Sequence, residues 1–585
     1  MAPPELFREA EGLSRRIVAT IAVGLAAGGL AVGFRRVLDA AYRVLLGRQS
    51  VLDGVAALPA WACIVYPAVG CAVAVGLVSR AQRGNQGVGG VMEAVALGRG
   101  RISFRASVAR ATACLAAVAT GASLGREGPI IQVGAGTGDA IGRRFALGEG
   151  DIRVLIAAGT AAGFAAAYGT PLAAVLFVAE VVTGAMSLRV LMPCALATVA
   201  STALSRAFVG AAPLYGAREF AVSDPVQIAL LVVVGVVAGV VGAGFMKLLA
   251  RGAGWFAHMP VPPVARGALG GALAGAIAIG LPGVAGNGYE TIHRVLDVGD
   301  AAGILVLLAA GKALATMCSV GSGTPGGVFT PALFLGAVVG RVLAAGFLWA
   351  GASGEPAAYA LVGMAAICAA TTHAPLMAAV FVFELSGDYG LALPLLAAAV
   401  VATAVARRLR RDSLYTGELR RRGVDWAEAP ARVMAGPAID AMTGAVAPAA
   451  GAAETVGGAL ADGASVNDAR GMRGASAVSG ASAASRGKAT GGGAAPSDAI
   501  AVAGHPLLPP GYVMALVPAP AWLHERPITD VQSHPGLPAV VAVRRGPDHQ
   551  WIDARGPVIV LRGDELLAAG SPEAMAMLGR FVPAG

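Results

Sequence analysis

Long apolar segments, separated by short polar or glycine-rich stretches, dominate the chain up to residue 406. Segments of this length predict membrane helices, because about 20 apolar residues cross a hydrocarbon core ~30 Å thick. Several are too short or too interrupted by glycine to cross the membrane alone. They predict broken helices whose freed backbone groups are satisfied by protein or by a water-filled cavity. The segments cover residues 15–34, 61–79, 106–124, 152–182, 190–208, 226–250, 265–281, 302–318, 332–350, 358–383 and 391–406.

The pattern changes after Arg422. Residues 441–500 are rich in Ala, Gly and Ser, which is typical of a flexible linker without a packed core. Apolar runs return after residue 501 and predict a small α+β domain; they are Val513–Val517, Val540–Val543 and Val558–Leu561. We therefore predict three parts: a membrane domain (1–425), a linker (426–500) and a cytoplasmic, candidate regulatory domain (501–585).

Composition supports a membrane protein. Of 585 residues, 56% are apolar and only 14% are charged, against about 25% charged in soluble proteins. Most of the chain must therefore face lipid. The six cysteines stand singly in apolar stretches, so neither a disulfide framework nor a metal site is expected. With no Walker loop or dinucleotide-binding motif present, we expect no cofactor.

The net charge of +9 does not indicate a nucleic-acid partner, because the basic residues gather at the edges of the membrane region. Arg15 and Arg16 precede the first apolar run, which we interpret as a membrane helix because no signal-cleavage site is evident. The second cluster comprises Arg407, Arg408, Arg410, Arg411, Arg420, Arg421 and Arg422. Such clusters mark the cytoplasmic side. We expect a multi-pass protein of the cell inner membrane with both termini in the cytoplasm.

The chain contains an internal repeat. Glycines and a proline of residues 121–138 recur in 323–340 at an offset of 202, and the segment that ends at Glu180 recurs at an offset of 204, ending at Glu384. Duplicated halves with broken segments indicate an ion or substrate site near the bilayer midplane. Periodicity alone leaves open whether the halves are parallel or inverted.

An arginine and a glutamate stand between two apolar stretches in Gly125-Arg126-Glu127-Gly128-Pro129. Ionisable residues at membrane depth are costly and indicate function. The repeat-mate, Gly327-Val328-Phe329-Thr330-Pro331, has the same layout without charge. Proline favours the first turn of a helix, so both segments predict helix N-termini, and two such termini aimed at one point form an anion site. The alternative is that the glycines serve only close helix packing.

These motifs resemble those of the CLC chloride channels and proton-coupled chloride exchangers. Gly125–Pro129 matches the family's second signature and Gly327–Pro331 its third, and residues 170–180 and 374–388 look like its two carboxylate-ended helices. The resemblance covers about residues 15–425. It implies an all-α membrane domain of eighteen helices with inverted repeats, assembled as a homodimer with one pore per subunit.

The same resemblance implies roles for individual residues. Glu127 corresponds to the gating glutamate. The family's first signature falls at residues 85–89 of this chain. The implied anion-binding residues lie in the three signatures and at the final-helix tyrosine: Gln86, Gly87, Val88, Arg126, Gly128, Val328, Phe329 and Tyr415. Without the resemblance, a tyrosine after a basic cluster would be interpreted as an interfacial anchor.

Two positions depart from the family pattern. Gln86 stands where the family has an anion-coordinating serine; its amide can donate a hydrogen bond but is larger and also carries a carbonyl. Val181 stands where exchangers often carry a glutamate that passes protons inward, and valine has no titratable group. Glu180 is the remaining proton-pathway candidate, although one residue along a helix turns it about 100° away.

Two other functions fit parts of the sequence. Gly121-Ala122-Ser123-Leu124-Gly125 has the G-x-S-x-G pattern of serine hydrolases, and His373 is the one histidine within a long apolar repeat element, which together would fit an intramembrane serine protease. A cation-coupled carrier could use Glu127, Glu180 and Glu384 as proton relays. Helix N-termini beside Arg126 favour an anion over a cation.

We therefore predict a transport protein without enzymatic activity. It conducts chloride or other small anions through the lipid bilayer, passively and as a channel, with a pore glutamate as gate. The alternatives are a proton-coupled chloride exchanger and a fluoride-selective CLC transporter.

Overall fold

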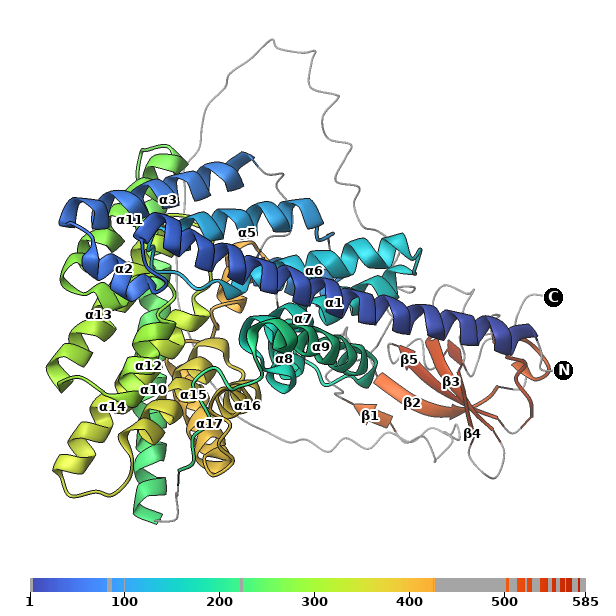
Figure 1. The fold of residues 1–585 in the computed structure, drawn as a ribbon. Helices are drawn as coiled ribbons and strands as arrows, with labels where there is room; N and C mark the ends of the chain where they lie inside the picture. The colour runs from blue at the N-terminus through green and yellow to red at the C-terminus, as the bar shows by residue number, and fades with distance from the viewer. Residues whose placement is uncertain are drawn as a thin grey trace, which may run out of the picture. The chain divides into compact units, whose positions relative to one another are not determined.

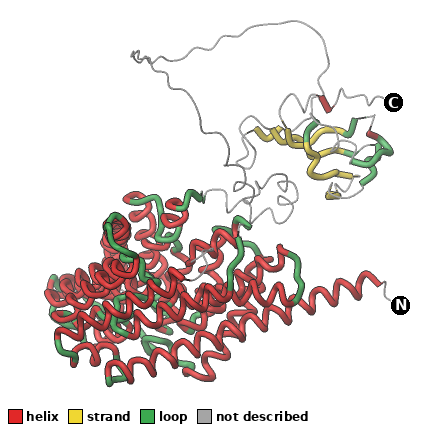
Figure 2. The backbone as a smooth tube through the Cα atoms, turned by 90° about the horizontal axis from the view of Figure 1, so that it is seen from above, coloured by secondary structure: helices red, strands yellow, loops and turns green. Residues whose placement is uncertain are grey.

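The computed structural model describes most of the membrane region and parts of the C-terminal region, namely residues 4–80, 87–98, 100–220, 225–424, 426, 501–503, 513–520, 523–528, 537–545, 550–553, 558–562, 564–570 and 577–578. The chain divides into two compact units, Met1–Ala447 and Pro448–Gly585. The described residues of the first are helical, and those of the second include a sheet (Figure 2). Apart from Trp426, the predicted linker lies outside the described residues.

The first repeat of the membrane unit holds the helices up to α9 (Figure 1). Their bounds are α1 Pro4–Leu46, α2 Val51–Ala57, α3 Ala60–Arg80, α4 Gly87–Ala96, α5 Phe104–Ala119, α6 Glu127–Arg144, α7 Glu149–Tyr168, α8 Pro171–Phe177 with the π-helical turn Val178–Thr183, and α9 Leu188–Val209.

The second repeat follows and likewise contains both long and short helices. Its bounds are α10 Pro225–Ala257, α11 Pro263–Gly280, the 3₁₀ turn Pro282–Val284, α12 Tyr289–Asp297, α13 Ala302–Gly321, α14 Phe329–Trp349, α15 Pro356–Thr372, α16 Pro375–Ser386, α17 Ala392–Leu409 and α18 Thr416–Arg421. The described residues thus form eighteen α-helices, and nine helical segments among them are long and apolar enough to cross a membrane.

Repeat-related glycines bring helices into backbone contact. A Cβ on Gly134 of α6 would collide with the carbonyl oxygen of Gly159 in α7, and a Cβ on Gly336 of α14 would collide with that of Gly363 in α15. Small residues of this kind let membrane helices approach closely. At these positions the glycines serve close helix packing in both repeats.

The helices break at repeat-related positions as well. Pro171 and Pro375 open α8 and α16, where the missing N–H of proline is not needed. The preceding helices end in left-handed residues, Gly169 (φ 75°) after α7 and His373 (φ 60°) after α15. The broken helices expected from the apolar pattern are thus confirmed.

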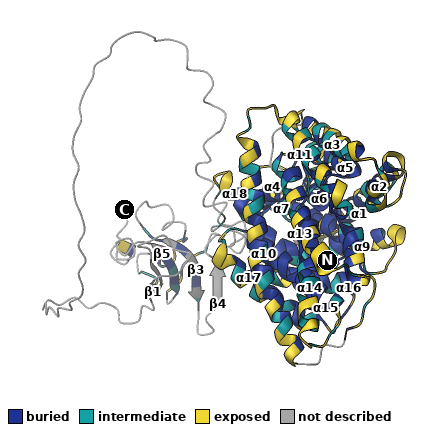
Figure 3. Ribbon diagram, turned by 90° about the vertical axis from the view of Figure 1, so that its left-hand side faces the viewer, coloured by how far each residue is buried: buried dark blue, intermediate teal, exposed yellow. Residues whose placement is uncertain are grey.

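The distribution of burial fits lipid as the surrounding solvent. Buried residues fill the interior of the membrane unit and exposed ones lie at its periphery (Figure 3). Many of the exposed residues are large and apolar. Val240 of α10 and Leu307 of α13 are examples, at 52% and 58% exposed. Exposed apolar surface on this scale is rare on soluble monomers. The predicted polytopic, all-α membrane fold with inverted repeats is confirmed.

The C-terminal unit contains a five-stranded antiparallel sheet in the order β1-β2-β5-β3-β4. The strands are β1 Ala501–Ala503, β2 Val513–Pro518, β3 Ala539–Arg545, β4 Gln550–Asp553 and β5 Glu565–Gly570. Val540 and Val543 of β3, on either side of a register shift, and Leu566 and Ala568 of β5 are buried in a small apolar core. The first two predicted apolar runs are strands, whereas the third is an extended segment joined to Pro527 by a single bridge at Ile559.

Candidate anion site

Two repeat-related helices converge on one point. α6 begins at Glu127 and α14 at Phe329. Directly before them, the N–H of Gly125 donates to the carbonyl of Gly327 over 2.8 Å, and the N–H of Gly327 donates back to the carbonyl of Gly125 over 2.6 Å. This antiparallel bridge brings together two helix N-termini, which carry unsatisfied amides and positive dipole ends.

The carboxylate of Glu127 lies between these helix ends. The residue is 1% exposed, and its Oε1 accepts a hydrogen bond of 2.8 Å from the backbone N–H of Thr330 in α14. Its Oε2 lies so close to Gly125 and Gly327 that a Cβ on either glycine would overlap it. These two glycines therefore make room for the carboxylate, and the glutamate of one repeat binds the helix N-terminus of the other.

Arg126 supplies positive charge beside the same point. Its side chain is buried, and its guanidinium lies over the ring of Tyr289 in α12, 5.0 Å from the ring centroid. Such a cation–π contact stabilises a cation away from water. Arg126 also interacts electrostatically with Glu127, so the surroundings of the helix ends favour negative charge.

A cavity of about 300 Å³ opens at the converging helix ends. Seven of the residues predicted from the sequence line it: Gly87, Val88, Glu127, Gly128, Val328, Phe329 and Tyr415. Arg110, Arg410 and Arg421 also line it, against one further carboxylate, Glu418. Gln86 lies outside the described residues, immediately before Gly87, whose N–H donates to Gln132 of α6 over 2.9 Å.

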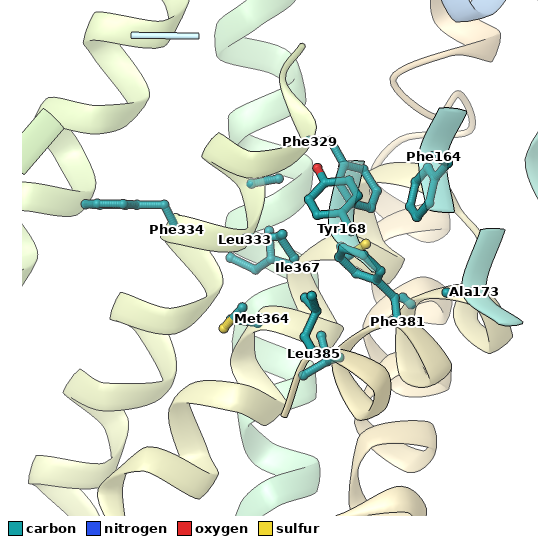
Figure 4. Close-up of a cluster of buried hydrophobic side chains, with 14 of the residues drawn as sticks. Phe164, Tyr168, Ala173, Phe329, Leu333, Phe334, Met364, Ile367, Phe381 and Leu385 are labelled. Atoms are coloured by element: carbon teal, nitrogen blue, oxygen red, sulfur yellow. The ribbon is translucent and has the colours of Figure 1, made fainter. Parts of the chain in front are cut away.

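Aromatic side chains from both repeats pack behind the start of α14. Phe329 contacts Phe164, Tyr168 and Phe381, with ring centroids 5.2–5.9 Å apart (Figure 4). The Tyr168 hydroxyl also lies 3.2 Å from the hydroxyl of Thr330. This cluster packs against Phe329, the first residue of α14, which lines the cavity.

Glu180 lies at a second cavity, of about 720 Å³, which Val181, His373, Arg407 and Arg411 also line. Both oxygens of Glu180 are engaged: Oε1 accepts from the N–H of Leu376 over 3.3 Å and Oε2 from the N–H of Met377 over 2.7 Å. The carboxylate therefore caps the N-terminus of α16. Val181 beside it offers no titratable group.

The serine-protease hypothesis finds no support in the geometry. The hydroxyl of Ser123 lies 3.1 Å from that of Thr316, and His373 is the left-handed C-cap of α15. His373 occupies the position that Gly169 takes in the first repeat, at the offset of 204 residues. Its place in the apolar repeat is thus explained by helix termination.

Comparison with known proteins agrees with this geometry. The family model described as voltage gated chloride channel matches residues 68–407. A putative chloride channel protein, ClcB-like, of Ralstonia nicotianae is 37% identical over 417 residues, which are 69% of this chain and 96% of the relative. The voltage-gated ClC-type chloride channel ClcB of Citrobacter koseri is 34% identical over 410 residues, covering 68% and 98% of the two chains.

A solved structure shares the fold as well. It is a slow cyanobacterial Cl⁻/H⁺ antiporter, 26% identical, with a TM-score of 0.65 over 70% of this chain and 98% of the other. The chain therefore belongs to the voltage-gated chloride channel (CLC) family of membrane anion-transport proteins, and it is not an enzyme.

The structure adds residues to the site that the sequence analysis passed over. Thr330 supplies the amide that binds Glu127, and Tyr168 supports Thr330. Lys312 is buried within α13 beside the loops that carry the site. Lys312 had a signal in the sequence, because it is an ionisable residue inside the apolar segment 302–318.

Proposed function

We propose that the chain conducts chloride and similar small anions passively, with the side chain of Glu127 as the gate. The observation that carries the proposal is the hydrogen bond from the Thr330 amide to the buried Glu127 carboxylate. A permeating anion needs the same helix N-termini, so the ionised carboxylate and the anion compete for one place. Protonation removes the charge of the carboxylate and with it the competitor.

The residues around the cavity provide the remaining contacts. The amides of Val328 and Phe329 stand at the N-terminus of α14, and Tyr415 lines the same cavity, with its ring centroid 6.1 Å from that of Phe177. We assign the anion to the space between these amides and the Tyr415 hydroxyl. Gly87, Val88 and Gly128 complete the lining, Gln86 provides a further amide donor, and Arg126 acts through its charge.

Conduction as a channel is favoured over proton-coupled exchange because the inner proton carrier is missing. Val181 cannot carry a proton, and the carboxylate of Glu180 already binds two amides of α16. Exchange is the second candidate, and the structural similarity to a Cl⁻/H⁺ antiporter favours it. Fluoride selectivity is a third candidate, motivated by Gln86.

Assembly and orientation belong to the same proposal. We assign both termini to the cytoplasmic side of the inner membrane, because Arg407 and Arg408 stand in the last turn of α17 and Arg420 and Arg421 in α18. A homodimer with one pathway per subunit is the expected assembly. Chemical cross-linking in membranes and the mass of the detergent-solubilised protein test it.

The gate is tested by chloride efflux from liposomes as a function of external and internal pH. Wild-type flux should rise as pH falls, because Glu127 becomes protonated. Glu127→Gln should keep flux high across the range and remove most of the pH dependence, since glutamine carries no charge at any pH. Glu355→Gln, an exposed residue before α15, is the matched control. Wild-type pH dependence in Glu127→Gln would exclude Glu127 as the gate.

A further inference from the structure

Lys312 is a fully buried lysine in the middle of α13, at 0% exposed. Lysines are almost never fully buried unless they are paired. Among the described residues, however, no carboxylate forms an ion pair with Lys312. The gate and the anion contacts proposed above leave this cation without a role.

The ammonium group binds the loop before α12. Its Nζ donates to the carbonyl of Val284 over 3.0 Å and to the carbonyl of Gly286 over 2.9 Å. It also lies 5.5 Å from the ring centroid of Phe334 in α14. Lys312 therefore ties α13 to the loop 282–288 and contacts the helix whose N-terminus binds the gate.

This loop in turn holds the segment that leads into Glu127. The N–H of Leu124 donates to the carbonyl of Gly286, and the N–H of Gly286 donates to the carbonyl of Gly121, each over 3.2 Å. One turn further along α13, Thr316 contacts Ser123 of the same segment. A continuous set of hydrogen bonds thus runs from Lys312 to the segment 121–125 directly before the gate.

Charge connects the same residues. Glu127 is the charged group that interacts with Lys312. The neutral titratable groups around Glu127 are Cys114, Tyr168, Tyr215, Tyr289 and Tyr415, and its cations are Arg126 and Lys312. The carboxylate of Glu127 therefore interacts electrostatically with two buried basic side chains, Arg126 and Lys312.

We propose that Lys312 is a positioning residue for the Glu127 gate. It fixes the loop 282–288, which is hydrogen-bonded to the segment 121–125 before the gate, and its charge stabilises both the ionised carboxylate and the anion that replaces it. This inference rests on the proposed role of Glu127. Removing the charge makes Glu127 easier to protonate, so the gate opens at higher pH, and it weakens anion binding.

Three variants separate charge from shape. Lys312→Gln keeps a hydrogen-bond donor without the charge, Lys312→Arg keeps the charge with another shape, and Thr316→Val removes a neighbouring hydrogen bond without touching charge. Lys247→Gln is the matched control, because Lys247 is exposed on α10. The readouts are the pH of half-maximal chloride flux in liposomes and the chloride concentration of half-maximal flux.

Lys312→Gln should shift the pH of half-maximal flux upward by about one unit, the size expected for losing a nearby opposite charge, and should raise the half-saturating chloride concentration several-fold. Lys312→Arg, Thr316→Val and Lys247→Gln should keep the wild-type pH midpoint. A wild-type midpoint in Lys312→Gln would overturn the proposal.

A displaced pH of half-maximal flux in Lys312→Arg would also overturn the proposal, even if Lys312→Gln does not reach the membrane. The variant Glu127→Gln, assayed in parallel, separates the two claims. If it retains the wild-type pH dependence, the gate itself is wrong. If it loses that dependence while Lys312→Gln matches the wild type, only the role of Lys312 is wrong.

Discussion

Glu180 and Glu384, which are repeat-mates, each cap the helix of the other repeat. Glu180 accepts hydrogen bonds from the N–H groups of Leu376 and Met377 at the start of α16, and Glu384 accepts from those of Leu172 and Ala173 at the start of α8, over 3.1 and 2.8 Å. A carboxylate at a helix N-terminus satisfies unpaired amides and complements the helix dipole. The symmetry of the two caps indicates a structural role for both glutamates.

This symmetry predicts matched losses of stability. Glu180→Gln and Glu384→Gln should each lower the free energy of unfolding by about 1–2 kcal/mol, because charged hydrogen-bond acceptors become neutral ones. Thermal unfolding in detergent measures the effect, with Glu219→Gln, an exposed residue in the loop after α9, as the unaffected control. Both variants should keep the wild-type pH dependence of flux. A proton-linked defect confined to Glu180→Gln would instead identify Glu180 as a proton carrier.

Replacement of Gln86 should change anion selectivity. Glutamine places its amide donor further from the backbone than serine places its hydroxyl, and its carbonyl repels anions. Gln86→Ser should therefore alter the nitrate/chloride and fluoride/chloride permeability ratios without loss of folded protein, while the neighbouring substitution Asn85→Ser should not. Unchanged ratios in Gln86→Ser would show that this side chain does not contact the anion.

The membrane unit should function without the C-terminal residues. Its described helices form their own core, and α18 ends at Arg421. A chain that ends at Val433 should insert, dimerise and conduct, with at most altered regulation. Size-exclusion chromatography and liposome flux of the shortened protein measure this. Loss of the dimer on shortening would assign the C-terminal residues a role in assembly.

The C-terminal sheet should be weakened by acid. Burial opposes the charge of Asp564, but hydrogen bonds from Arg545, at 2.6–3.1 Å, and from the N–H of Leu561 hold the pKa of this carboxyl below its ordinary value. A folded-state pKa below the unfolded one stabilises the fold above about pH 3.9, and this contribution is lost as pH falls through the folded-state value.

Pepsin cleavage of the full-length protein between about pH 4 and pH 2 tests this expectation. Cleavage within residues 537–570 should accelerate as pH falls in the wild type. Asp564→Asn should already be cleaved readily at the upper pH and should change less. Equal resistance of the two proteins across the range would mean that the Arg545–Asp564 pair does not stabilise the sheet.

The sequence predicted the parts of the structure that depend on local pattern. Glu127 and its flanking glycines were identified because a charge between apolar stretches and a Gly-Pro helix start can be seen in a few adjacent residues. The caps by Glu180 and Glu384 were not, because they join residues about 200 positions apart. Lys312 was visible as a charge inside the apolar segment 302–318, but its role was not, because its partners are backbone carbonyls of a loop, which carry no side-chain signature.

Contacts between distant residues also limit what the sequence predicts of the C-terminal sheet. The apolar runs of β2 and β3 were visible in the sequence, but β5 pairs with both of them, Leu567 lying opposite Leu516 and Ala542. Such non-local pairing depends on how the whole unit packs. The third apolar run, Val558–Leu561, supplies the buried Val560 without becoming a strand.

The central claim is that this chain carries anions past the Glu127 gate without coupling them to protons. The most direct test is to impose a chloride gradient on liposomes that contain the wild-type protein and to record proton movement across the membrane. We expect anion flux with little or no uphill proton transport, because Val181 and the capped Glu180 leave the inner end of the route without a carrier. A reproducible, fixed ratio of protons to chloride would contradict it and identify a coupled exchanger.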